Sequence, residues 1–345
     1  MLFYDLLVHT NAYSDNNFKY LFYGDGVFAK TFLSFDNVDK IAHRNKFSLI
    51  WQLRKFIKKN RIDVVHSHTP YGMVYAFLAT LFLPVKRVLT VHGSGNSLNS
   101  KIIFNLSFAL SHRVLFVSFA FKKRLLRFLN IKDKKKFKVV YNGLNVSKFS
   151  RGISSSKDQG VIKSGMVGNF YNDVRDHLTV CKAAKILQQN NIPFKLEFVG
   201  GAKEHNTAYL DACVNYITAN HLSGSVSFLG SRDDVDKLLA TWDLFLYSSN
   251  RDSFGIAVIE AMFKGIPIMV NDLDVFEEIT QKGKYATLYK TKDAEDLARK
   301  IKAYIQNPAH CHLKAKAAAN YAVENFSIEK HVTELHKIYQ ELKHA

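Results

Sequence analysis

Short β-rich runs alternate with stretches of helical periodicity along almost the whole sequence. Such alternation is typical of βαβ units, in which parallel strands form a sheet and helices cover it. The expected strands are residues 18–23, 62–65, 87–91, 113–117 and 138–140 in the first half, and 161–167, 195–199, 226–229, 244–247 and 268–270 in the second. The pattern predicts an α/β protein with two doubly wound, Rossmann-like domains.

A change in composition marks the expected boundary between the two domains. After Asn142 and Gly143 the residues become small and polar up to Gly160, as they do in linkers. We therefore assign residues 1–148 to the first domain and residues 149–345 to the second.

The C-terminal part of the chain is helical in pattern from Asp293 onward. We expect the last helix, which begins near Ile328, to pack back on the first domain. Open α/β sheets bind ligands at the carboxyl ends of their strands. A cleft between two facing domains is therefore the expected place for the function.

Composition narrows the class of protein. The three cysteines, Cys181, Cys213 and Cys311, are far apart and form no Cys-x-x-Cys pair, so we expect free thiols and no bound metal. The N-terminus has an early acid, Asp5, and no basic region, unlike a secretory signal. The longest apolar stretch, residues 72–84, is shorter than the roughly 20 residues that span a bilayer. We expect a cytoplasmic protein that can lie peripherally on the inner face of the plasma membrane.

The formal net charge of +18 implies an anionic partner. The densest basic segment runs from Lys122 to Lys138, with apolar residues such as Phe121 and Leu125 between the cations. A solvated helix face, an anionic membrane surface and a nucleic-acid surface are all compatible with this segment. No nucleic-acid-binding module accompanies the charge, so nucleic acid is the least expected of the three partners.

The most informative segment runs from Tyr247 to Pro267. An apolar strand ends at Tyr247, a polar loop follows, and a helix is expected between Gly255 and Gly265. Asp252 lies just before that helix, where free amide hydrogens and the positive end of the helix dipole favour phosphate. Glu260 falls about one and a half turns into the helix at 3.6 residues per turn. The alternative is an ordinary capped helix with a solvent-facing glutamate.

This segment resembles the Glu-x7-Glu region of the retaining glycosyltransferases of family 4, which have the GT-B fold. Further landmarks of that family occur in the same order. They are Asp63-Val-Val-His-Ser-His68, Leu89-Thr-Val-His92-Gly93, Val139-Val-Tyr-Asn142-Gly143, Met166-Val-Gly168, Phe198-Val-Gly-Gly201 and Phe228-Leu-Gly230. The resemblance is close to continuous from about residue 60 to residue 285. It implies a GT-B pair of domains, with the acceptor on the first and the nucleotide sugar on the second.

The resemblance also implies roles for residues of the second domain. Glu260 corresponds to the acid that binds the ribose hydroxyls of the nucleotide, and its two oxygens suit a vicinal diol. The amides near Ser253, Phe254, Gly255 and Ile256 correspond to those that hold the sugar and diphosphate. Asp252 takes the position of the acid that faces the transferred sugar. The family more often has glutamate there, and the missing methylene pulls the carboxylate back by roughly 1.5 Å.

The diphosphate-binding cations depart further from the family pattern. The family commonly places arginine directly after the glycine of the first strand of this domain, where this chain has Asn169 after Gly168. We align Arg175 with the family lysine a few residues later, and its guanidinium can bind a departing diphosphate with paired bonds. Asn169 can donate a hydrogen bond but cannot neutralise charge. A loop residue such as Lys203 is a candidate for the second cation.

The first domain contributes one predicted site residue and one departure. His92 ends an apolar strand before Gly93, and the resemblance implies that its ring approaches the sugar. The family normally opens with a β-strand and a glycine-rich turn, whereas residues 1–7 here read like the end of the first helix. We therefore expect the first domain to lack its first strand.

Together these features predict a metal-independent, retaining glycosyltransferase. It would move a sugar from a UDP- or GDP-linked donor to a glycan or lipid-linked acceptor in surface polysaccharide synthesis, for capsule or lipopolysaccharide. The donor is a substrate, and no cofactor is expected. No opposed carboxylate pair of the glycosidase kind is identifiable in the sequence. The alternative is a non-catalytic basic protein that binds a membrane surface or a nucleotide sugar.

Overall fold

The computed structural model describes residues 2–10, 18–23, 33–41, 45–93, 98–149 and 160–344. The chain forms two compact units. Unit 1 is Met1–Leu144 with Ser327–Ala345, and unit 2 is Asn145–Phe326. Most of the predicted linker up to Gly160 lies outside the described residues.

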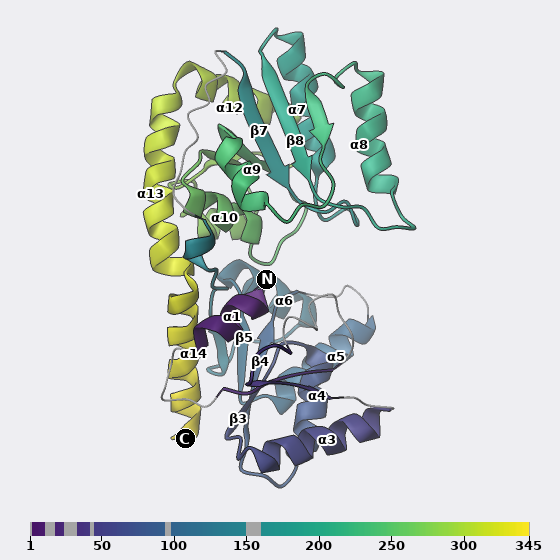
Figure 1. Cartoon of the computed structure of the whole chain (residues 1–345), viewed down its shortest axis with the longest axis vertical. Helices are drawn as coiled ribbons and strands as arrows, with labels where there is room; N and C mark the ends of the chain where they lie inside the picture. Colours follow the sequence, from purple (N-terminus) through teal and green to yellow (C-terminus); the bar gives the residue numbers. More distant parts are fainter. Residues whose placement is uncertain are drawn as a thin grey trace. The chain divides into compact units, whose positions relative to one another are not determined.

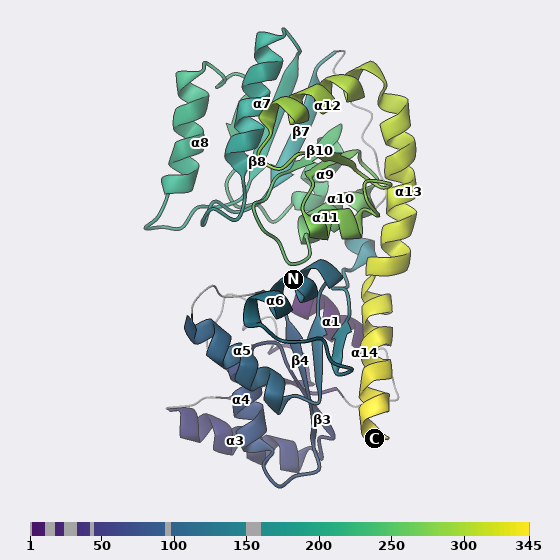
Figure 2. The same ribbon diagram turned by 180° about the vertical axis from the view of Figure 1, so that it is seen from behind.

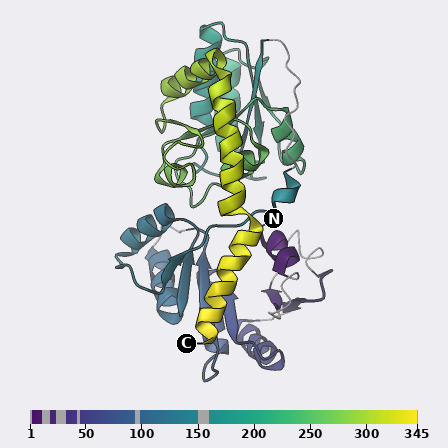
Figure 3. The ribbon, with the colours of Figure 1, turned by 90° about the vertical axis from the view of Figure 1, so that its left-hand side faces the viewer.

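Unit 1 is built on a parallel sheet with strand order β3-β4-β5-β6 (Figure 1). Its strands are β3 (Val64–Ser67), β4 (Lys86–Val91), β5 (Arg113–Phe116) and β6 (Phe137–Val139). The helices are α1 (Leu2–Thr10), α3 (Lys46–Lys59), α4 (Pro70–Ala79), α5 (Leu98–Leu110), α6 (Phe119–Leu129) and α14 (Ile328–Lys343). A separate parallel pair is formed by β1 (Tyr20–Tyr23) and β2 (Val38–Ile41). Helix α14 runs along one side of the four-stranded sheet (Figure 3).

Unit 2 is built on a six-stranded parallel sheet with order β12-β11-β10-β7-β8-β9 (Figure 2). Its strands are β7 (Ile162–Val167), β8 (Phe194–Val199), β9 (Val226–Phe228), β10 (Leu244–Tyr247), β11 (Ile268–Asn271) and β12 (Thr287–Tyr289). Its helices are α7 (His177–Gln189), α8 (Ala208–Ala219), α9 (Val235–Thr241), α10 (Ile256–Lys264), α11 (Asp274–Ile279), α12 (Ala294–Gln306) and α13 (Pro308–Phe326), with a short 3-10 turn at Val146–Lys148. From β7 the sheet continues through β8 to β9 on one side, and from β10 it continues through β11 to β12 on the other. The strand order therefore reverses between the neighbours β7 and β10. Ligands of open α/β sheets bind at such a switch point.

Two glycines of the family landmarks allow parts of the chain to approach closely. A Cβ on Gly200 would lie 2.1 Å from the carbonyl oxygen of Gly168, so the loops that follow β7 and β8 meet where only glycine fits. A Cβ on Gly143 would lie 2.4 Å from Cβ of His331, at the start of α14. Glycine is therefore required at both positions by packing.

The basic segment from Lys122 to Lys138 does not expose an apolar face. Phe121, Leu125, Leu126 and Leu129 of α6 are all buried in the core of unit 1. Lys122 is paired with Asp133 at 2.7 Å. The apolar residues fill the space between α6 and the sheet, so the predicted membrane surface of this segment would consist of its cations alone.

Helix α14 is attached to unit 1 by apolar packing and by a chain of aromatic polar groups. Its residues Ile328, Val332 and Leu335 share a core cluster with Val88 and Leu115 of the sheet. His66 on β3 lies 2.6 Å from the hydroxyl of Tyr339 and 2.7 Å from Thr90 Oγ1. His331 Nδ1 lies 2.6 Å from the carbonyl oxygen of Tyr141 and donates to it.

Four buried imidazoles of unit 1 have lowered pKa values and are therefore neutral near pH 7. Burial lowers the pKa of His66 to about 3, and the neighbouring His331 and His92 add to the shift. Burial likewise lowers the pKa of His92 and of His331 to about 4. Burial places the pKa of His68 well below its usual value, and the nearby His66 and His92 lower it further. In unit 2 a single such histidine, His177, has its pKa lowered to about 4, chiefly by burial.

These shifts predict that unit 1 loses stability in mild acid. The unfolded chain takes up protons below a pKa of about 6.5, whereas the folded histidines stay neutral down to about pH 4, so stability falls as pH decreases across that window. One histidine with a folded pKa of about 4 costs about 2 kcal/mol at pH 5 relative to pH 8. Hydrogen exchange, corrected for its intrinsic pH dependence, should show β3, β4 and α14 losing more protection at pH 5 than β8 and β10. Equal losses in both units would contradict this account.

Candidate active site

The predicted site residues of unit 2 gather at the carboxyl ends of β7 and β10. Asn169 directly follows the Gly168 turn after β7, and Arg175 lies in the loop that leads into α7. Asp252 lies in the loop between β10 and α10. The two loops are joined by a bridge between Arg175 and Ser249. The structure therefore brings Arg175 and Asp252 together at the strand-order switch, across 77 positions of sequence.

The carboxylate of Asp252 is the centre of this arrangement. Its Oδ1 accepts hydrogen bonds from the amides of Ser253, Phe254 and Gly255 at 2.7, 3.2 and 3.2 Å. Its Oδ2 accepts from the hydroxyl of Tyr247 at 3.2 Å and lies 3.0 Å from Arg175 Nη1. The side chain is only 9% exposed. Asp252 thus fixes the loop between β10 and α10 through its bonds to the amides and pairs with the neighbouring Arg175.

Arg175 is held by three groups. Its Nη1 atom pairs with Asp252 and donates to Ser249 Oγ at 3.0 Å. Its guanidinium carbon lies 5.2 Å from the centre of the Tyr247 ring. Burial alone would lower the pKa of Arg175, but Tyr247 and Asp252 outweigh it, so the pKa is raised and the charge is retained. Burial raises the pKa of Tyr247 well above 10, with Asp252 adding to the shift and Glu260 making a smaller contribution.

Helix α10 begins at a glycine that no other residue could replace without strain. Gly255 has φ +86°, and a Cβ there would lie 2.8 Å from the ring of Phe276. The amides of Val258 and Ile259 already donate to the carbonyl of Gly255. Ile256 and Ala257 are the first two residues of the helix, so their amides have no carbonyl within the helix to bind.

This geometry changes the prediction for the backbone amides. The amides of Ser253, Phe254 and Gly255 are directed to Asp252. Of the four amides predicted to bind the donor, only that of Ile256 starts the helix. Ala257 was not predicted, although its position as second residue of the helix makes it an equivalent donor.

Glu260 is partly buried on α10. It stands four residues after Ile256, so the two side chains lie on the same side of the helix. Asn169 is exposed, and its Oδ1 accepts from the amide of Gly201 at 3.0 Å. Lys203 is exposed in the next loop, with its Nζ 5.9 Å from the ring centre of Tyr171.

His92 belongs to unit 1, where it follows the last residue of β4. Its Nε2 lies 3.0 Å from Nδ1 of His68, and the two rings are stacked. His68 is in turn stacked on His66. His92 is therefore the outer member of the histidine chain described above, and both His66 and His68 hold it in place.

A buried support for the site was missed in the sequence. Asn271, at the end of β11, accepts from the amide of Ser249 at 3.0 Å and donates to the Ser249 carbonyl at 2.8 Å. Its side chain also donates to Thr291 Oγ1 at 2.9 Å. The sequence did contain an indication of this role, because Asn271 is a polar residue at the end of an apolar strand. The same kind of position led to the prediction of His92.

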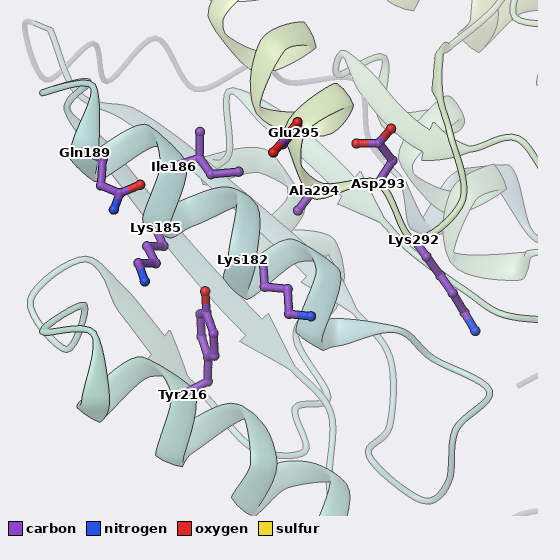
Figure 4. Close-up of a pocket in the computed structure, with 9 residues that line it drawn as sticks. All are labelled: Lys182, Lys185, Ile186, Gln189, Tyr216, Lys292, Asp293, Ala294 and Glu295. Atoms are coloured by element: carbon purple, nitrogen blue, oxygen red, sulfur yellow. The ribbon is translucent and has the colours of Figure 1, made fainter.

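A separate groove of about 590 Å³ lies beside α7, α8 and the start of α12 (Figure 4). It is lined by Lys182, Lys185, Ile186, Gln189, Tyr216, Lys292, Asp293, Ala294 and Glu295. None of the predicted site residues lines it. Its lysines are balanced in part by Asp293 and Glu295, so it lacks the focused charge that a diphosphate requires.

Within the described ranges, no group of three or more His, Cys, Asp or Glu side chains could hold a metal ion. Among the helices in those ranges, none combines the length and the apolar character needed to cross a bilayer.

Both halves of this chain are similar in sequence to families of known proteins. The family described as Glycosyl transferases group 1 matches residues 153–343, and that described as Glycosyltransferase Family 4 matches residues 26–148. N-acetyl-alpha-D-glucosaminyl L-malate synthase of Bacillus anthracis is 26% identical over 86% of this chain and 79% of its own length. The Escherichia coli UDP-Gal:alpha-D-GlcNAc-diphosphoundecaprenol alpha-1,3-galactosyltransferase is 24% identical over 83% of this chain and 77% of its own.

Solved structures agree with the fold. A glycosyltransferase from Rickettsia africae has a TM-score of 0.82 at 19% identity, over 94% of this chain and 90% of that chain. Anabaena HepE in complex with UDP and glucose has a TM-score of 0.79 at 19% identity, over 98% and 95% of the two chains. The predicted fold class and enzyme class are confirmed. The chain belongs to the group 1 glycosyl transferases and is a retaining family 4 glycosyltransferase of the GT-B fold.

Proposed function

We propose that this glycosyltransferase moves a sugar from a UDP-linked donor to a lipid-linked acceptor during synthesis of a bacterial surface polysaccharide. The observation that carries the proposal is the Arg175–Asp252 pair, which stands beside the free amides of α10 at the strand-order switch. A cation and helix amides at one point suit a diphosphate. UDP is preferred over GDP because the Escherichia coli relative is named for a UDP-sugar and HepE was solved with UDP.

The proposed division of work within unit 2 follows from the contacts. Glu260 binds the ribose hydroxyls, and the amides of Ile256 and Ala257 bind the phosphates. Arg175 stabilises the departing diphosphate, and the exposed Lys203 is the candidate for a second cation. Asn169 ties the loop after β7 to that after β8 through Gly201, which shapes the site without adding charge.

Asp252 is proposed as a positioning residue. A carboxylate has about four acceptor sites, and those of Asp252 already serve three amides, a hydroxyl and a guanidinium. Its action on the sugar therefore passes through Arg175 and through the loop before α10. The amides of Ser253, Phe254 and Gly255 act in the same indirect way, since they fix Asp252.

The proposed reaction keeps the configuration of the sugar. The acceptor oxygen bonds to the anomeric carbon on the face from which UDP leaves, while the bond from that carbon to the diphosphate oxygen breaks. The hydroxyl proton passes to an oxygen of the leaving diphosphate. The protein then supplies positioning and stabilisation of the negative charge, for which Arg175 is placed.

Unit 1 is proposed as the acceptor side and unit 2 as the donor side. The acceptor is proposed to be lipid-linked because the Escherichia coli relative is named for a diphosphoundecaprenol acceptor. His92 is proposed to approach the transferred sugar as a neutral imidazole, since its pKa is lowered to about 4 by burial. A neutral ring can donate or accept a hydrogen bond with a sugar hydroxyl without adding charge.

The first test is nucleotide binding to wild type and Glu260→Gln by isothermal titration. Loss of the carboxylate removes charge-assisted bonds worth about 1.5–3 kcal/mol, so UDP affinity should fall about 10- to 100-fold. Wild type should bind UDP more tightly than GDP. Glu295→Gln, which alters the separate groove of Figure 4, is the matched control and should leave UDP affinity unchanged. A folded wild type that binds neither nucleotide would overturn the proposal.

The second test separates kcat from KM in Arg175 variants. Arg175→Ala should lower kcat of transfer about 10²- to 10³-fold, because a charge contact to the leaving group is lost and Asp252 is left without its cation. Arg175→Lys should recover part of kcat, since it restores the charge but not the paired geometry. Arg251→Ala removes an exposed arginine of the neighbouring loop that pairs with Asp173 at 2.9 Å. If that control lowered kcat as much as Arg175→Ala, the assignment of Arg175 would be wrong.

A further inference from the structure

Unit 1 exposes large apolar side chains on three neighbouring helices. We call this set the apolar face. Its members are Phe47, Trp51, Tyr71, Leu78, Phe82, Leu98, Ile102 and Leu106. They are eight of the sixteen large apolar side chains that the described residues leave exposed, although these helices form only a small part of the chain. Exposed apolar residues scattered singly need no explanation, but a group of them indicates an interaction surface.

The spacing of these residues places them in stripes along the helices. On α3, Phe47 and Trp51 are four residues apart, and on α5, Leu98, Ile102 and Leu106 recur every four residues. On α4, Tyr71 and Leu78 are seven apart, while Phe82 lies three residues beyond the end of the helix at Ala79, where helical spacing no longer applies. Residues at these spacings share one side of a helix. Each helix therefore buries one side and presents an apolar stripe on the other.

The three helices form a fixed layer. Arg54 of α3 donates to the carbonyl oxygens of Ala79 and Leu81 at 3.0 and 2.8 Å, which ties α3 to the end of α4. Arg87 of β4 donates to the carbonyl oxygen of Leu110 at the end of α5 at 2.8 Å and lies over the ring of Phe77 in α4. Within unit 1, Figures 1 and 2 both show α3, α4 and α5 on the side of the sheet away from α14. The stripes therefore lie on adjacent helices of one layer.

Phe82 is the most exposed member of the face. Its side chain is 97% exposed, and its backbone has φ +60°. A positive φ is costly for a bulky residue, and full exposure of a phenyl ring costs further free energy. The fold gains nothing within the chain from this ring. An exposed phenyl ring of this kind adds apolar area to the face that only a contact outside the chain could cover.

The charge around the apolar face is of one sign. Helices α3, α4 and α5 carry six Lys and Arg residues and no Asp or Glu. Asp63, which follows α3 in the sequence, is paired with Lys343 at 3.1 Å. Lys46, Lys55, Lys58 and Lys59 are exposed on α3, and Lys55 lies 5.5 Å from the ring centre of Trp51. Aromatic and aliphatic side chains flanked by lysines, without acids, suit a surface with an apolar interior and anionic headgroups.

We propose that the apolar face of α3, α4 and α5 docks on an anionic phospholipid bilayer, with its aromatic side chains in the headgroup region and its lysines on the phosphates. This apolar face replaces the Lys122–Lys138 segment as the proposed membrane surface, because the apolar residues of α6 are buried. The inference rests on the proposed function in one respect, since a lipid-linked acceptor resides in a bilayer.

Trp51 supplies a direct probe. The protein has two tryptophans, and Trp242 is buried in unit 2 at 2% exposure, whereas Trp51 is 64% exposed on the apolar face. With vesicles of phosphatidylcholine and phosphatidylglycerol that contain no acceptor, Trp51 fluorescence should shift to the blue and be quenched by brominated lipid. Co-sedimentation should weaken at high salt or without phosphatidylglycerol. The variant W51S/F82S/I102S should lower the vesicle partition coefficient at least about tenfold, because three apolar anchors are lost.

The matched control is Y209S/L313S, which removes two exposed apolar side chains from unit 2. It should bind vesicles like wild type, and both variants should keep wild-type UDP affinity, which shows that unit 2 is intact. Vesicle binding that W51S/F82S/I102S leaves unchanged would overturn the proposal. So would an absence of vesicle binding, or a dimer in solution that this variant converts to a monomer. UDP titration of wild type is independent of these results, so failure of docking and failure of the proposed function are distinguishable.

Discussion

The carboxylate of Asp252 is the group on which the proposed donor site of this protein depends. It gathers the three amides that precede α10, and it also accepts from Tyr247 and pairs with Arg175. A short side chain is needed for this, since an aspartate readily bonds to amides one to three residues ahead of itself. The longer glutamate that the family more often has at this position would carry its carboxylate away from those amides. The departure at Asp252 therefore has a local physical reason.

The consequences of that carboxylate extend through unit 2. With the loop closed upon Asp252, Gly255 takes its positive φ and the first amides of α10 are presented without partners in the helix. Arg175 keeps its charge although it is largely buried, because Tyr247 and Asp252 surround it. Asn271 bonds to both the amide and the carbonyl of Ser249. The loop between β10 and α10 is therefore fixed by Asn271 at its start and by Asp252 near its end. A site organised in this way needs little rearrangement to stabilise a departing diphosphate.

Unit 1 is organised by a different kind of polar group. His66, His68 and His92 form a stacked chain of neutral rings that ends at Tyr339 of α14. The same chain attaches α14 to the sheet and orients His92. Stability and the orientation of His92 are therefore coupled in unit 1, whereas in unit 2 the proposed site is organised by an ion pair.

Much of this could be predicted from sequence because the signals are local. The strand, polar loop and helix from Tyr247 to Gly265, with glycine at each end of the helix, were visible in the order of the residues. The short strands β2 and β12 were missed, since a strand of three or four residues offers too little alternation to recognise. The pairing of Arg175 with Asp252 could not be read either, because only the folded sheet brings them together.

The exposed apolar face of α3, α4 and α5 could not be predicted from the sequence for a related reason. Amphipathic periodicity indicates that a helix has an apolar side, but it does not indicate whether the protein covers that side. In α6 the apolar side is buried, and in α3, α4 and α5 apolar residues occur on both sides, so that one set remains exposed. The choice between them depends on packing that no single helix specifies.

The central claim is that the Asp252-centred site of unit 2 binds a UDP-sugar and transfers its sugar with retention. The most direct measurement is the anomeric configuration of the product, determined from the proton coupling constant of the new linkage by NMR. Purified protein would be supplied with UDP-linked α-sugars and a diphosphate-lipid acceptor. The account predicts that UDP is released and that the product carries an α-linkage. An inverted β-linked product, or UDP binding without any transfer to the acceptor, would contradict it.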